Sequence, residues 1–112
     1  GAFVGVVGIS KPTFEAPFMP AIEISWRLAR TSWGQGYASE AAAAVIQHAF
    51  TTLGIDALVS FTAEWNRPSR RVMEKIGMTH DPRDDFLHPG LPAGHKLAAH
   101  VLYRIRRPAA SV

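Results

Sequence analysis

A glycine-rich stretch at residues 33–38, Trp33-Gly34-Gln35-Gly36-Tyr37-Ala38, has the residue types best suited to binding a ligand. It follows a strand-like run at 22–28 and leads into an alanine-rich helical pattern at 39–53. Glycines free the backbone from Cβ atoms, and the unpaired N–H groups at a helix start converge on one point together with the positive end of the helix dipole. The stretch therefore predicts an anion site, most often for a phosphate, although a tight turn that binds nothing has the same pattern.

Two common phosphate-binding motifs do not fit this stretch. A Walker loop requires a Lys after its last glycine, and none follows Gly36. A dinucleotide fingerprint requires a third glycine where this chain has Ser39. It also requires an acidic residue at the end of a second strand, whereas Asp56 precedes the next strand.

The composition is that of an ordinary globular domain. The chain has 112 residues, of which 47% are hydrophobic and 19% charged, so one domain with a modest core is expected. Cysteine is absent, which excludes disulfides and thiolate ligands and fits a cytoplasmic protein. The five histidines lack the spacing of a helical zinc pair, so no metal site is expected.

Hydrophobic periodicity divides the chain into a small number of elements. Strands are predicted at 3–9, 22–28, 57–63 and 101–105, and helices at 39–53 and 66–77. The first two strands can pair as a hairpin, and the polar region at 79–95 is predicted as a loop with room for one short strand. The order β-β-α-β-α-(β)-β predicts a mixed α/β or α+β layer fold.

A second motif is Asn66-Arg67-Pro68-Ser69, with Gly77-Met78 at the end of the helix that it starts. It follows two earlier motifs along the chain, the strand Glu23-Ile24-Ser25-Trp26-Arg27-Leu28 and the glycine turn. In order and spacing, residues 23–78 resemble the GCN5-related N-acetyltransferase (GNAT) family. The closest likeness is to its RimJ/RimL-type branch, whose members acetylate protein N-termini among other amines.

The resemblance implies a mixed, mostly antiparallel sheet with helices on both faces. Family members begin with a strand, two helices and another strand before the hairpin found here. We therefore expect residues 1–112 to be a single, N-terminally truncated acetyl-CoA-binding domain. A homodimer is compatible with the family, and neither a nucleic acid nor a membrane is an expected partner.

The resemblance also assigns the cosubstrate site. Backbone N–H groups along the glycine turn would bind the CoA pyrophosphate, and the residues concerned are Trp33, Gly34, Gln35, Gly36, Tyr37, Ala38 and Ser39. The strand end Leu28–Ala29 would pair with the pantetheine arm and polarise the thioester carbonyl. The family pattern starts with Gln or Arg where this chain has Thr31, so Arg30 either substitutes for it or faces solvent.

The second motif adds the remaining contacts. Asn66 would bond the pantetheine amide, unless it only caps the helix, and Ser69 would lie near the thioester sulfur. Arg70 or Arg71 would reach the 3′-phosphate of CoA, unless both are simply solvated.

The chemistry that the resemblance implies is direct attack of a neutral amine on the acetyl thioester, followed by loss of the CoA thiolate. An amine is mostly protonated at neutral pH, so a base helps. Glu23 is the leading candidate, the alternative being a surface carboxylate paired with Arg27, and Glu64 is a weaker candidate. Many relatives place a proton-donating Tyr where this chain has Met73, so either Ser69 serves as the acid or the thiolate leaves unassisted.

Two other functions stay open on the sequence. The departure at Met73 allows a non-catalytic acyl-CoA-binding module. The cluster Arg67, Arg70 and Arg71 allows a basic nucleic-acid binder, although no aromatic platform is interleaved with these arginines.

Overall fold

The structure, a computed structural model, describes residues 5–14, 16–28, 36–92 and 94–108. Its strands are β1 (Gly5–Ser10), β2 (Glu23–Leu28), β3 (Ala57–Ala63), β4 (Thr79–His80), β5 (Phe86–Leu87) and β6 (Ala99–Arg106). Its helices are α1 (Tyr37–Thr51), α2 (Arg67–Lys75) and the short 3-10 helix η2 (Pro82–Asp84). The predicted order is confirmed, and the optional strand is present as two short strands, β4 and β5.

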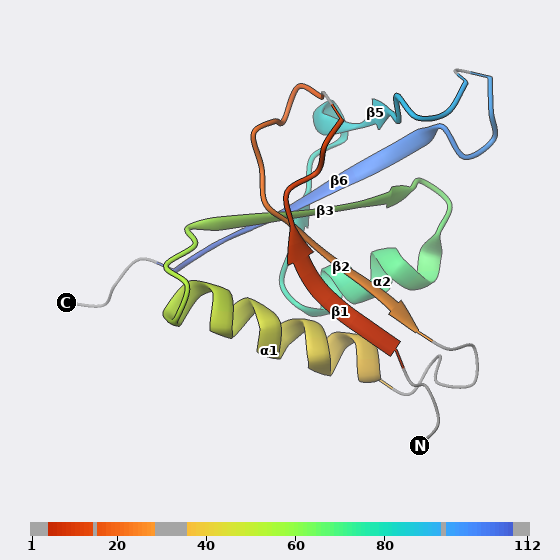
Figure 1. The fold of residues 1–112 in the computed structure, drawn as a ribbon. Coiled ribbons are helices and arrows are strands. Elements are labelled where there is room, and N and C mark those ends of the chain that lie inside the picture. Colours follow the sequence, from red (N-terminus) through yellow and green to blue (C-terminus); the bar gives the residue numbers. More distant parts are fainter. Residues whose placement is uncertain (1–4, 15, 29–35, 93, 109–112) are drawn as a thin grey trace.

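One mixed sheet organises the fold (Figure 1). The strand order is β1-β2-β3-β6-β4, with β5 also paired to β6. The predicted hairpin forms, since β1 runs antiparallel to β2 with Gly8 opposite Ser25. The pair β2–β3 is parallel and the other described pairs are antiparallel. The predicted fold class, a mixed and mostly antiparallel sheet, is thereby confirmed. The expected helices on both faces are not found in the described residues, because α1 and α2 pack into one core on the same face of the sheet.

The hydrophobic core lies between the sheet and the two α-helices. Strand residues alternate between faces, and Ile24 of β2 and Leu58 of β3 face this core with no exposed surface. The helix α1 contributes a stripe of small and apolar residues, as its sequence pattern predicts. The other core members are Ala42, Ile46, Ala49, Phe50, Met73, Met78, Val101 and Tyr103.

The opposite face of the sheet carries a cluster of half-buried aromatic rings. Phe61 of β3 packs against Phe14 and Phe18 from the β1–β2 loop, with ring centroids 5.4 and 5.9 Å apart. Phe86 of β5 lies 5.8 Å from Phe61. The β1–β2 loop, which the sequence marks only as proline-rich, therefore covers the side of the sheet away from α1.

Left-handed glycines mark the ends of both helices. Gly36 precedes α1 with φ 78°, Gly54 follows it with φ 68°, and Gly77 follows α2 with φ 92°. Residues other than glycine rarely adopt such φ values, so each glycine fixes a helix boundary. None of the helices in the described ranges is long and apolar enough to cross a bilayer.

Candidate active site

The two middle strands of the sheet separate soon after they meet. Among the described residues, the β2–β3 ladder consists of the single pair Glu23–Val59, supported by a 2.9 Å bond from the Val59 N–H to the Ile22 carbonyl. Beyond that pair, β2 stays paired with β1 as far as Leu28, and β3 stays paired with β6 as far as Ala63. The facing edges of the two strands therefore diverge toward their carboxyl ends, as Figure 1 shows. Such edges can bond an extended, amide-containing ligand as an added strand.

The start of α1 follows the carboxyl end of β2. Gly36 is its N-cap residue and supplies no side-chain cap. The N–H of Glu40 donates to the Gly36 carbonyl at 3.0 Å, so the amides of Tyr37, Ala38 and Ser39 lie ahead of this bond, in the first turn of the helix. These are the amides that a helix start presents to an anion, and the structure thus provides the donor geometry that the sequence predicts for this end of the motif.

The start of α2 follows the carboxyl end of β3. The Asn66 side chain accepts a hydrogen bond from the Ser69 N–H at 3.4 Å and donates to the Thr62 hydroxyl at 3.0 Å. Asn66 is thus a helix cap in this structure, which is one of the two roles that the sequence leaves open for it. Its carbonyl oxygen is a hydrogen-bond acceptor with two lone pairs, so capping does not exclude a ligand contact. Asn66 and Ser69 are both half-buried.

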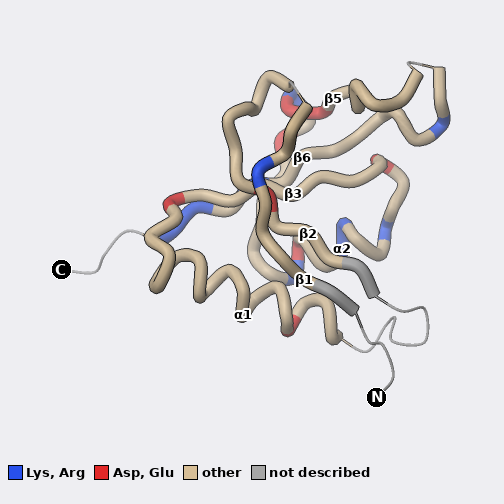
Figure 2. The backbone as a smooth tube through the Cα atoms, viewed as in Figure 1, with Lys and Arg blue, Asp and Glu red and all other residues tan. Residues whose placement is uncertain are grey.

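An arginine-rich pocket of about 440 Å³ lies along α2, and Figure 2 shows basic residues on this helix. It is lined by Glu64, Trp65, Arg67, Arg70, Arg71 and Glu74. Part of the Arg70 guanidinium is engaged inside the protein, because its Nη1 donates to the Glu64 carbonyl at 2.6 Å and its Nε to the Tyr103 hydroxyl at 3.3 Å. Arg71 on the same helix is exposed. The donor set fits a phosphate.

Glu23 lies at the point where β2 and β3 meet, on the face of β2 opposite Ile24. It is half-buried, and this burial raises the pKa of its carboxyl group above the ordinary value. A carboxylate with a raised pKa is better matched to general-base work near neutral pH. The role of Glu23 as a general base stays a prediction from the resemblance.

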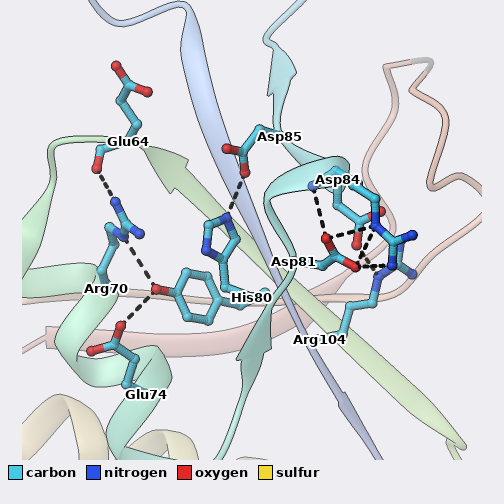
Figure 3. Close-up of polar contacts among 10 residues, drawn as sticks. Glu64, Arg70, Glu74, His80, Asp81, Asp84, Asp85 and Arg104 are labelled. Carbon is cyan, nitrogen blue, oxygen red and sulfur yellow. Dashed lines mark hydrogen bonds and ion pairs between the residues drawn. The ribbon is translucent and has the colours of Figure 1, made fainter.

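Met73 belongs to the hydrophobic core, with 1% of its surface exposed. Tyr103 on β6 belongs to the same core cluster, is also 1% exposed, and donates its phenol proton to a Glu74 carboxylate oxygen at 2.9 Å. The same hydroxyl accepts a hydrogen bond from the Arg70 Nε at 3.3 Å, so it lies between Arg70 and Glu74, which are both labelled in Figure 3. The sequence did not indicate Tyr103, because it lies 33 residues from Arg70 and in a different element.

Several predicted site residues lie outside the described ranges: Ala29, Arg30, Thr31, Trp33, Gly34 and Gln35. Leu28 is described as the last residue of β2, where its backbone pairs with Gly5. Within the described residues, no group of three or more His, Asp or Glu side chains is arranged to hold a metal ion.

Comparisons with known proteins agree with this geometry. Residues 1–79 match the family model described as "Acetyltransferase (GNAT) domain". FsC-acetyl coenzyme A-N(2)-transacetylase from Aspergillus fumigatus is 37% identical over 84 residues, covering 71% of this chain and 36% of that protein. An acetyltransferase from Agrobacterium tumefaciens superposes with a TM-score of 0.68 at 35% identity, covering 93% of this chain and 53% of that one.

Mycobacterium smegmatis RimJ, solved in complex with CoA-disulfide, superposes with a TM-score of 0.73 at 26% identity, covering 95% of this chain and 48% of RimJ. The chain belongs to the GNAT family of acetyltransferases, which confirms the resemblance drawn from the sequence. It spans less than half the length of the curated relatives it matches, with coverages of 44%, 36% and 42%.

Proposed function

We propose that this chain forms the acetyl-CoA-binding part of an N-acetyltransferase that transfers the acetyl group to a primary amine. Family membership supports the reaction class. The observation that carries the proposal is the divergence of β2 and β3 beyond the pair Glu23–Val59, with a helix start following each strand end. Anions are favoured at helix starts and extended amide chains at open strand edges, and CoA contains both groups.

Each part of the cosubstrate has a proposed set of contacts. The turn from Trp33 through Ser39, of which the structure describes Gly36 onward, would bind the pyrophosphate. The backbone of Leu28–Ala29 would bond the pantetheine arm from one side, and Asn66 with Ser69 from the other. Arg30, Arg70 and Arg71 are the candidates for the phosphates.

Titration calorimetry of the 112-residue chain with CoA tests the binding half of this proposal. Saturable one-to-one binding is the expected result, and no heat of binding at millimolar CoA would contradict it. Turnover with acetyl-CoA and a panel of amines tests the catalytic half. Binding without acetylation of any amine would favour the alternative, a non-catalytic acyl-CoA-binding module, which the burial of Met73 in the core supports.

For the acceptor, we propose an amine on a peptide N-terminus or a small molecule. Likeness to RimJ supports the first choice, and the name of the Aspergillus relative, an N(2)-transacetylase, supports the second. The panel should therefore hold Ala- and Ser-initiated peptides, polyamines and other small-molecule primary amines. A cytoplasmic location and a homodimer stay predictions.

Glu23→Gln is expected to change stability in a pH-dependent way. Because its pKa is raised, the folded protein binds this proton more tightly than the unfolded chain does. Stability therefore falls as pH rises from the ordinary value of 4.5 through the folded pKa, and the loss is complete above it. Thermal melts should show Glu23→Gln gaining in Tm at about pH 8 and not at about pH 4. Glu64→Gln, which removes an exposed carboxylate, is the matched control.

The same variant tests Glu23 as the general base. Loss of a positioned base lowers kcat by about 10²-fold or more, and the acid limb of the pH–rate profile should disappear with it. An unchanged kcat would remove Glu23 from the mechanism, and a comparable loss in Glu64→Gln instead would transfer the role to Glu64.

A further inference from the structure

The turn between β3 and α2 is held by polar contacts from several directions. The Glu64 N–H donates to the Ala99 carbonyl at 2.9 Å, and the Trp65 indole N–H donates to the Lys96 carbonyl at 3.2 Å. These two bonds fasten the turn to β6 and to the loop that precedes it.

A second set of contacts joins α2 to β6 and to Glu64 in the turn (Figure 3). From the first half of the helix, Arg70 bonds the Glu64 carbonyl at 2.6 Å and the Tyr103 hydroxyl at 3.3 Å. From one turn further along, Glu74 accepts the proton of that hydroxyl at 2.9 Å. The Tyr103 hydroxyl thus accepts from one charged side chain of α2 and donates to the other.

The centre of this arrangement is rigid. Tyr103 is 1% exposed and belongs to the core strand β6. Its ring stacks on that of His80, with centroids 5.1 Å apart and planes 20° apart, and His80 is itself bonded to Asp85 at 2.7 Å. The hydrogen bond from Arg70 to Tyr103 is the largest cause that raises the pKa of Arg70, so the guanidinium stays charged.

We propose that Arg70, Tyr103 and Glu74 form a brace that sets the position of the first turn of α2, and hence of Asn66 and Ser69, for the pantetheine arm of CoA. Tyr103 is then a positioning residue that touches no ligand. The first turn of α2 is within reach of the brace because Arg70 is one helical turn from Asn66, whose carbonyl accepts the Arg70 N–H at 3.1 Å. The role for CoA rests on the proposed function.

The test distinguishes an effect on binding of the pantetheine arm from an effect on binding of the nucleotide. Tyr103→Phe and Arg70→Gln are titrated with CoA and with adenosine 3′,5′-bisphosphate, which lacks the arm. We expect the Kd for CoA to rise about threefold in Tyr103→Phe, with the Kd for the bisphosphate unchanged. In Arg70→Gln we expect the Kd for CoA to rise about tenfold and the Kd for the bisphosphate to rise by less, because Arg70 is also a candidate phosphate ligand. The control is Arg104→Gln, at the residue that follows Tyr103 on β6. It breaks the 3.2 Å ion pair of Arg104 with Asp84 of η2 and should bind both compounds like the wild type.

Other outcomes overturn the proposal. An equal loss for both compounds in Arg70→Gln would make Arg70 a direct phosphate ligand. Unchanged CoA binding in Tyr103→Phe would show that the brace positions nothing, while leaving the proposed function standing.

Hydrogen exchange gives a readout that does not depend on CoA. Exchange is measured at a temperature at which the wild type is fully folded. The amides of residues 66–70 should then exchange about tenfold faster in Tyr103→Phe and Arg70→Gln than in Arg104→Gln. If the wild type fails to bind CoA, the proposed function fails and this measurement still decides whether the brace exists. Equal exchange in all three variants contradicts it.

Discussion

Replacing Gly36 with alanine is expected to lower the affinity for CoA by about tenfold or more. Gly36 has φ 78°, and an L-residue held there costs about 1–2 kcal/mol. Among the described residues, and apart from its chain neighbours, a Cβ at this position would meet no atom within 4 Å, so the cost counted here is backbone strain. The helix start can relieve the strain by rotating, and the amides of Tyr37, Ala38 and Ser39 would then turn away from the pyrophosphate.

Gly54→Ala is a matched control for this variant. Gly54 lies just beyond the other end of α1 with φ 68°, and a Cβ there also meets nothing within 4 Å. Both variants should therefore lose similar stability in thermal melts, but only Gly36→Ala should lose CoA affinity in calorimetry. Gly36→Asn should recover part of that affinity, because Asn tolerates the left-handed region better than Ala. Equal CoA affinities in Gly36→Ala and Gly54→Ala would contradict the pyrophosphate assignment.

Much of this fold could be predicted because its signals are local. The run at Ala57–Ala63 has the bounds of β3 as predicted, and the alternation around Ile24 places it in the core. The helices predicted at 39–53 and 66–77 end next to Gly54 and at Gly77, and both glycines have positive φ in the structure. Each of these signals depends on a few neighbouring residues, whose steric and hydrophobic preferences are the same before and after folding.

The contacts that could not be predicted join segments far apart in the chain. Nothing in the β1–β2 loop indicates that Phe14 packs on Phe61, because that contact depends on the path of the whole loop. The bond from Arg70 to Tyr103 spans 33 positions and depends on β6 pairing with β3. The same holds for the candidate site. Its motifs can be recognised in the sequence, but the tertiary contacts that hold them in place cannot.

Met73 is a position at which this chain departs from the pattern that the family resemblance implies. Many relatives, as the resemblance implies, carry a Tyr here that donates a proton to the leaving thiolate. In this chain the side chain is 1% exposed and packs in the same core cluster as Ile24, Leu58 and Tyr103. A buried thioether cannot donate a proton, so this position contributes packing rather than acid catalysis.

Three substitutions at Met73 separate packing from catalysis. Met73→Leu conserves volume and should cost less than about 1.5 kcal/mol. Met73→Ala removes most of a buried side chain and should cost about 2–5 kcal/mol, which lowers the Tm by roughly 10–20 °C. Met73→Tyr must fit a larger ring and a hydroxyl into the same space, so we expect it to cost about 2–4 kcal/mol and to leave kcat no higher than in the wild type.

The last of these outcomes decides between two accounts of the site. Because a domain of this size has a total stability of about 5–15 kcal/mol, Met73→Tyr should still fold at low temperature, where its kcat can be measured. Because position 73 is buried in the core, its phenol should gain no access to the thioester, and the leaving thiolate then depends on Ser69 or on no acid at all. A rise in kcat together with an unchanged Tm would instead mean that position 73 faces the cosubstrate, and that core packing is not what keeps methionine there.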